Sequence, residues 1–181
     1  GQVDKVDIII DRDTGQSKGF GFIEMPVNGD AEKAIAGLPT AQVKAFSIDD
    51  VGTTEIDDAL SLTPIGNGLY RLGIHIAAPG LLIQKGDRFD QVARERMSTV
   101  YFPGDKITML PDAVIAQFSL DEGAARPALS IYVDIDSTGV VDKESLQLRA
   151  EMVPMGSNLR LENLEHLVTE ESLADESSDY A

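Results

Sequence analysis

Residues 46–60 read FSIDDVGTTEIDDAL, and this stretch decides both the fold and the chemistry predicted for the 181-residue chain. Five carboxylates stand within ten positions, from Asp49 to Asp58. Carboxylates at close range disfavour one another's ionisation unless a cation neutralises them. A solvated acidic turn is the simpler alternative, but the aliphatic residues of the stretch are expected to hold it against a core: Ile48, Ile56, Ala59 and Leu60.

The side chains of this acidic stretch favour a hard divalent cation. They offer only oxygen ligands, with no histidine or cysteine nearby, which suits Mg²⁺, or Mn²⁺ in its place, better than Zn²⁺. Such an ion generates a hydroxide nucleophile from bound water and offsets charge on a phosphoryl oxygen. The stretch therefore predicts phosphodiester hydrolysis.

The residues around the acidic stretch predict short strands interrupted by turns and a few helices. Strands are expected at 45–48, 59–62 and 69–76, with a turn at Gly66-Asn67-Gly68. A helix is predicted from Asp87 to Met97, and a short one from Pro111. A hairpin of strands 129–136 and 140–149 should follow, then an amphipathic tail at 158–167.

The acidic stretch resembles the catalytic signature of the RNB domain, found in the ribonuclease II and ribonuclease R family. That signature is an Ile-Asp, a short spacer, an acidic residue, an apolar residue and Asp-Asp-Ala, so its four carboxylates fall on Asp49, Glu55, Asp57 and Asp58. The resemblance implies that Asp49 and Asp58 contact the metal most directly, while the other two hold waters and the scissile phosphate. Better-known members have aspartate at position 55; the longer glutamate is expected to alter metal position or affinity.

The resemblance extends over residues 45–167. Residues 73–79 are similar to the family's His-Ile-Ala-Asp strand, and Phe118-Ser119-Leu120 to a later Cys-Ser-Leu. Tyr101 falls where the family has a tyrosine that stacks on a base near the cleavage site. The family's arginine-bearing motif, which stabilises phosphate charge, has no match here, so a missing domain or a partner is expected to supply that arginine.

A second motif lies near the N-terminus, in a predicted hairpin whose second strand reads KGFGFIEM from Lys18 to Met25. Strand alternation is expected to place Phe20 and Phe22 on one face, where rings can stack on unpaired bases. The segment resembles the octapeptide of the RNA-recognition motif, or RRM, and the resemblance implies RNA binding through Lys18, Phe20 and Phe22. Two core phenylalanines in a glycine-rich hairpin are the alternative.

Composition narrows the classes of function. Zero cysteines exclude disulfides and thiolate chemistry and agree with a reducing cytoplasm. No apolar run approaches the roughly 20 residues of a membrane helix, and no phosphate-binding glycine loop is present, so neither a membrane nor a nucleotide cofactor is expected. The net charge of -16 opposes binding to a polyanion, but residues 151–181 hold one basic and eight acidic side chains. That acidic end can lie away from a binding face.

These observations predict an α+β protein with mixed or antiparallel sheets and a few helices. We expect a partial RRM-like hairpin and helix at 1–38, the N-terminal part of an RNB-like domain at 39–170 and an acidic, frayed tail at 171–181. By resemblance, the function is Mg²⁺-dependent hydrolytic 3′-to-5′ exoribonuclease action on single-stranded RNA, in the cytoplasm. The alternatives are a non-catalytic RNA-binding or regulatory module that uses the RRM-like face, and an inactive recombined scaffold.

Overall fold

The computed structural model describes residues 5–10, 17–24 and 33–166, the first two ranges as backbone only. The chain divides into two units. A hairpin–helix unit comprises Gly1–Pro39 and Ala78–Phe118, and a barrel unit comprises Thr40–Ala77 and Ser119–Ala181. Strands outnumber helices in the described residues, which confirms the α+β prediction.

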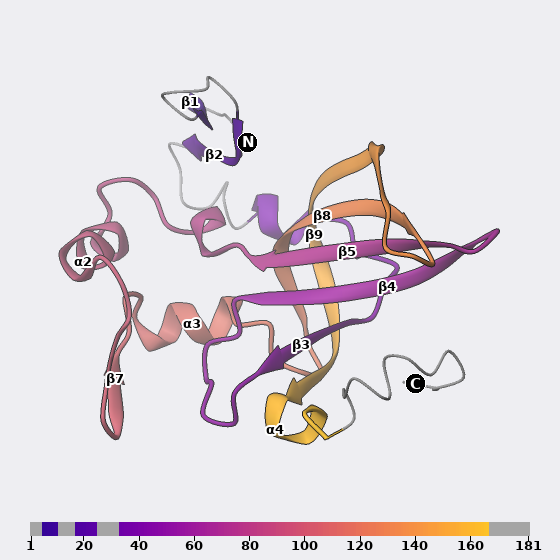
Figure 1. The fold of residues 1–181 in the computed structure, drawn as a ribbon. Coiled ribbons are helices and arrows are strands. Elements are labelled where there is room, and N and C mark those ends of the chain that lie inside the picture. Colours follow the sequence, from indigo (N-terminus) through magenta and orange to yellow (C-terminus); the bar gives the residue numbers. More distant parts are fainter. Residues whose placement is uncertain (1–4, 11–16, 25–32, 167–181) are drawn as a thin grey trace. The chain divides into compact units, whose positions relative to one another are not determined.

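The barrel unit is a closed five-stranded sheet in the order β3-β4-β5-β8-β9 (Figure 1). Its strands are β3 (Ala45–Asp49), β4 (Asp58–Gly66), β5 (Leu69–Ala77), β8 (Ala125–Asp136) and β9 (Val141–Arg160). Neighbours pair antiparallel, except that β3 and β9 pair parallel and so close the barrel. Closure removes the exposed edges that an open sheet would present.

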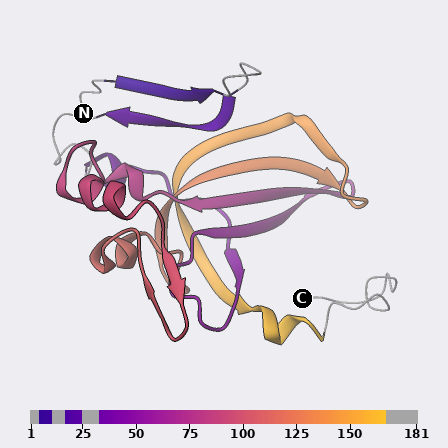
Figure 2. The same cartoon turned by 60° about the vertical axis from the view of Figure 1, so that its left-hand side comes forward.

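Two turns set the registers of the long hairpins, which Figures 1 and 2 show as extended pairs of strands. Asn67 and Gly68 join Gly66 to its partner Leu69 with φ values of 55° and 72°, as a type I′ turn requires. Between β8 and β9, the Asp136 carboxylate accepts hydrogen bonds from the backbone N–H groups of Thr138 and Val140, at 2.8 and 3.0 Å. Hydrogen bonding, chiefly from Thr138, lowers the pKa of Asp136.

Strand β9 is longer than predicted. The pattern indicated a strand ending at Arg149 and an amphipathic tail from Asn158, whereas the strand continues to Arg160 and α4 covers only Leu161–Leu164. The extra length exists because β9 stays paired with β8 as far as Pro154, and residues 155–160 then pair with β3, where Ser47 is the partner of Asn158. Local periodicity does not reveal such a long-range pairing.

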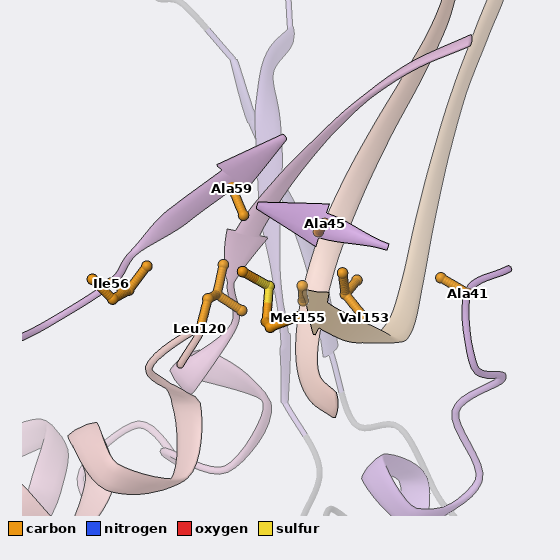
Figure 3. Close-up of a cluster of buried hydrophobic side chains, with 8 residues drawn as sticks. Ala41, Ala45, Ile56, Ala59, Leu120, Val153 and Met155 are labelled. Carbon is orange, nitrogen blue, oxygen red and sulfur yellow. The ribbon is translucent and has the colours of Figure 1, made fainter. Parts of the chain in front are cut away.

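The apolar core of the barrel unit forms where β3, β4, β8 and β9 meet the segment after α3. Figure 3 shows this cluster of buried side chains, to which the segments just before β3 and β4 also contribute. Its members are Ala41, Ala45, Ile56, Ala59, Leu120, Ala128, Val153 and Met155. Ile56 and Ala59 are thus buried as predicted, but Ile48 is 49% exposed and the prediction that it walls the acidic stretch was wrong. Strand alternation turns Ala45 and Ser47 inward and therefore Ile48 outward.

The hairpin–helix unit contains the antiparallel pair β1 (Lys5–Ile10) and β2 (Ser17–Glu24), and residues 33–36 are helical. It continues with η1 (Pro79–Leu81), α2 (Arg88–Arg96), the short pair β6 (Val100–Phe102) and β7 (Asp105–Ile107), and α3 (Asp112–Phe118). The predicted helix start is confirmed, since the Asp87 carboxylate caps α2 by accepting from two backbone N–H groups. Met97 ends the helix in a left-handed conformation and is 80% exposed.

Candidate functional site

The four signature carboxylates lie at one end of the β3–β4 pair and on the loop that joins these strands. Asp49 is the last residue of β3 and Asp58 the first residue of β4, while Glu55 and Asp57 belong to the connecting loop. The strands are antiparallel, with Phe46 opposite Leu60. Continuing this register brings Asp49 and Asp58 to the same end of the pair. The structure therefore groups the backbone positions that the sequence singled out.

The loop between the two strands is anchored at Ile56, which lies between Glu55 and Asp57 and is 2% exposed. Its backbone N–H donates to Ser119 Oγ at 3.1 Å, and its carbonyl accepts from the Leu120 N–H at 2.9 Å. The Asp57 carbonyl accepts from the Ala77 N–H at 2.8 Å. These bonds fix the backbone on both sides of Glu55 and Asp57. The match at Phe118-Ser119-Leu120 was the only sequence signal for this anchor.

Asp49 is held by a chain of hydrogen bonds for which the sequence contains no signal. Ser47 Oγ donates to Asp49 Oδ2 at 2.5 Å, and Asn158 Nδ2 donates to Ser47 Oγ at 2.8 Å. Ser47 is 2% exposed and Asp49 is half-buried. Because Asn158 lies 111 positions from Ser47, no local motif could have joined them.

The positively charged side chain of Arg160 also lies beside the acidic loop. Arg160 is the register partner of Asp49 in the parallel β3–β9 pair, and its Nη1 donates to the Asp50 carbonyl at 3.0 Å. The sequence pattern placed this arginine in the predicted amphipathic tail at 158–167 and indicated no role for it. Its guanidinium thus contacts the backbone of the acidic loop, which it meets only because β9 closes the barrel.

The donor set of this region suits magnesium by its chemistry, although its side chains are not gathered into a cage. Within residues 33–166, no three histidine or acidic side chains lie close enough together to hold a metal ion. Mg²⁺ keeps several waters in most protein sites and needs only one or two carboxylates, so Asp49 and Asp58 fit that requirement.

No described helix has the length and apolar character needed to cross a membrane.

The predicted RNA-contacting residues lie in the other unit. Tyr101, on β6, is 72% exposed, and Lys106 Nζ lies 5.8 Å from the centroid of its ring. An exposed ring beside a cation is a suitable surface for stacking a base. Strand β2 carries Lys18, Phe20 and Phe22. The structure describes only the backbone of this strand, so the prediction that the two rings share one face stays a prediction.

A buried polar network fills the barrel interior: Ser61, His75, Ser130, Tyr132 and Glu151. His75 is fully buried, with Nε2 2.9 Å from Ser61 Oγ and Nδ1 2.8 Å from Ser130 Oγ. Burial lowers the pKa of His75, although the charge of Glu151 opposes this. Burial and the hydrogen bond to Glu151 raise the pKa of Tyr132 to about 12. Because all five side chains are buried, a substrate cannot reach this network. The network therefore belongs to the structure of the barrel and is not a hydrolytic triad.

Comparisons with known proteins agree with the two sequence resemblances. A family model described as RNB domain matches residues 40–176, and one described as RNA recognition motif matches residues 1–48. Exoribonuclease 2 of Vibrio vulnificus is 32% identical over 157 residues, which cover 86% of this chain and 23% of that protein. An uncharacterized ribonuclease of Synechocystis is 39% identical over 100 residues, covering 55% of this chain and 15% of that one. The chain thus spans less than a quarter of the length of these relatives.

Solved structures share the fold. RNase R of Mycoplasma genitalium, in complex with ribose-methylated single-stranded RNA, superposes with a TM-score of 0.65 at 17% identity, covering 86% of this chain and 24% of that one. Yeast Ssd1, described as a pseudonuclease, gives a TM-score of 0.65 at 22% identity, covering 87% of this chain and 19% of that one. The same fold therefore occurs both in a ribonuclease and in a protein described as a pseudonuclease.

Proposed function

The chain belongs to the RNB domain family through residues 40–176, and from this premise we propose that it carries the metal-binding part of a hydrolytic 3′-to-5′ exoribonuclease site for single-stranded RNA. The observation that carries the proposal is the position of Asp49 and Asp58 at one end of the β3–β4 pair, on either side of an anchored loop. Strand ends and an anchored loop hold functional side chains more firmly than a free loop does.

Each carboxylate has a proposed part in this chemistry. Asp49 and Asp58 would hold Mg²⁺, or Mn²⁺ in its place, and Glu55 and Asp57 would orient waters and the scissile phosphate. The bound ion supplies an activated water and neutralises charge that develops on the phosphoryl oxygens. Ile56, buried between Glu55 and Asp57, keeps their backbone in place while RNA binds. The exposed ring of Tyr101 would stack on a base.

A labelled single-stranded RNA incubated with the protein and Mg²⁺ tests this proposal. We expect shortening from the 3′ end that stops when a chelator is added and in the Asp57→Asn variant. Asp50→Asn is the matched control, because Asp50 is an exposed carboxylate of the same loop outside the signature. Shortening that continues in Asp57→Asn, or that needs no metal, would contradict the proposal.

A second candidate function is RNA binding without cleavage. It is favoured by the absence of any three gathered metal donors in residues 33–166 and by the RNA recognition motif match at residues 1–48. In this case the RNA would be bound but not shortened, and Phe20→Ala would weaken binding while Asp57→Asn would not. The same labelled RNA, followed by a gel shift, distinguishes the two functions.

A further inference from the structure

The orientation of Asp49 is determined by residues that lie outside the acidic signature. We propose that Ser47 and Asn158 are positioning residues that hold the Asp49 carboxylate in the orientation in which it binds a divalent cation. This inference rests on the proposed function for the identity of the cation. The hydrogen-bond chain itself is a property of the barrel.

The donors and acceptors around Asn158 determine which group donates at each step of this series of hydrogen bonds. Its Oδ1 accepts from the Glu122 backbone N–H at 2.7 Å, so this end of the amide is the oxygen. Its Nδ2 then faces two oxygens, the Leu120 carbonyl at 2.9 Å and Ser47 Oγ at 2.8 Å. The amide therefore cannot be flipped without setting an oxygen against a carbonyl.

The direction at Asn158 determines the direction at Ser47. A serine hydroxyl has one proton to donate. Because Ser47 Oγ accepts from Asn158, that proton is available to Asp49 Oδ2, 2.5 Å away. Ser47 is 2% exposed, so water does not compete for this hydroxyl. One acceptor position of Oδ2 is thereby taken by Ser47, and Oδ1 is the oxygen that this hydrogen-bond chain leaves open to a cation.

The anchoring of the loop uses the same segment, which supports one positioning system for the whole stretch. Leu120 donates its N–H to the Ile56 carbonyl and accepts from Asn158 Nδ2 at its own carbonyl. The segment after α3 thus holds the loop at Ile56 and, through Asn158 and Ser47, the end of β3 at Asp49. Groups that orient metal ligands in this way affect metal affinity strongly, about 10- to 100-fold on removal.

The test measures Mn²⁺ affinity by isothermal titration calorimetry on the whole chain, together with the midpoint of chemical unfolding. Ser47→Ala is expected to weaken Mn²⁺ binding about 10-fold or more, and Ser47→Thr, which keeps the hydroxyl, to restore most of it. Ser61→Ala is the matched control: it removes an equally buried hydroxyl, one that faces His75 and not Asp49. It should lower the unfolding midpoint without changing Mn²⁺ affinity.

Asn158→Asp separates positioning from simple electrostatics. A carboxylate at position 158 cannot donate, so the Ser47 proton turns toward it and away from Asp49. An added negative charge near the site would by itself strengthen cation binding, whereas loss of the Ser47 hydrogen bond weakens it. Weaker Mn²⁺ binding in Asn158→Asp supports positioning, and unchanged or tighter binding overturns it.

A metal-independent measurement keeps the two proposals distinguishable. The χ1 coupling constants of Asp49, measured by NMR without metal, should report one rotamer in the native chain and an average over rotamers in Ser47→Ala. If the native chain binds no Mn²⁺, the metal-site proposal fails, and these couplings alone decide whether Ser47 orients Asp49. Native Mn²⁺ binding that is equally strong in Ser47→Ala overturns positioning and leaves the proposed function standing.

Discussion

Replacing Gly73 with alanine is expected to destabilise the barrel through the buried polar network. Gly73 lies on β5, opposite Ser61 on β4 and Tyr132 on β8. A Cβ added there would meet Ser61 Oγ in a severe clash, His75 Nε2 at 2.8 Å and Tyr132 Cε1 at 2.9 Å. Its φ lies outside the left-handed region, so the effect is steric and not conformational. All three contacted side chains are buried, which leaves them little room to move.

The magnitude follows from the groups that must shift. Forcing one extra carbon into a packed interior costs about 1–3 kcal/mol, and breaking the Ser61–His75 hydrogen bond costs about 1 kcal/mol more. Alanine loses less backbone entropy than glycine when the strand forms, and this difference offsets roughly 0.5–1 kcal/mol of the cost. We therefore expect the free energy of unfolding to fall by roughly 1–3.5 kcal/mol, which lowers the melting temperature by about 2–14 °C for a chain of this size.

Urea unfolding followed by circular dichroism measures this change, and two other glycines calibrate it. Gly52→Ala should stay within about 0.5 kcal/mol of the native protein, because nothing lies within 4 Å of its added Cβ. At Gly156 the added carbon meets only the stem of Lys44, at 2.9 Å, and this flexible side chain can move aside. A Gly73→Ala variant as stable as Gly52→Ala would refute the packing described for the barrel interior.

Three further predictions concern pH, the loop anchor and the exposed ring. Burial keeps His75 neutral in the folded barrel, whereas the unfolded chain takes up a proton below pH about 6.5. The contribution of His75 to the free energy of unfolding is therefore fully present above that pH and is lost as the pH falls, by at most about 1.4 kcal/mol per pH unit. Urea unfolding should show a smaller pH slope in His75→Gln but not in His166→Gln, which changes the exposed second histidine. Ser119→Ala leaves the buried Ile56 N–H without its acceptor and should lower the free energy of unfolding by about 1–3 kcal/mol; an unchanged unfolding midpoint would argue against the anchor. Tyr101→Ala should weaken binding to single-stranded RNA by about 1–3 kcal/mol in a fluorescence titration without lowering the melting temperature, since the ring is 72% exposed; equal affinity would remove Tyr101 from the proposed RNA surface.

Features encoded by neighbouring residues could be predicted from the sequence. The turn at Asn67 and Gly68, the start of α2 at Asp87 and the strands on either side of the acidic stretch all depend on residues a few positions apart. Backbone sterics and helix capping act over that range, so the local sequence pattern is enough to predict these turns and element ends. The exposure of Ile48 was predicted wrongly because hydrophobicity was given more weight than strand alternation, which turns Ser47 inward.

Features that depend on barrel closure could not be predicted. The contacts of Asn158 with Ser47 and of Ser119 with Ile56 join residues 111 and 63 positions apart. Nothing in the neighbourhood of Asn158 distinguishes a strand that pairs with β3 from an amphipathic tail. The carboxylates of the candidate site were therefore identified by their motif, whereas the residues that hold them became visible only in the structure.

The parallel pairing of β3 with β9 also has a consequence for how the chain acquires its structure. The hairpins β4–β5 and β8–β9 join strands that are close in sequence, whereas β3 meets its β9 partner only across 111 positions. Contacts between distant residues form slowly, since the entropy of closing the long intervening loop must first be overcome. Closure is thus expected to be a late event in folding, and in a chain still on the ribosome Asn158 could not bond to Ser47 until residues 141–160 emerge from the exit tunnel.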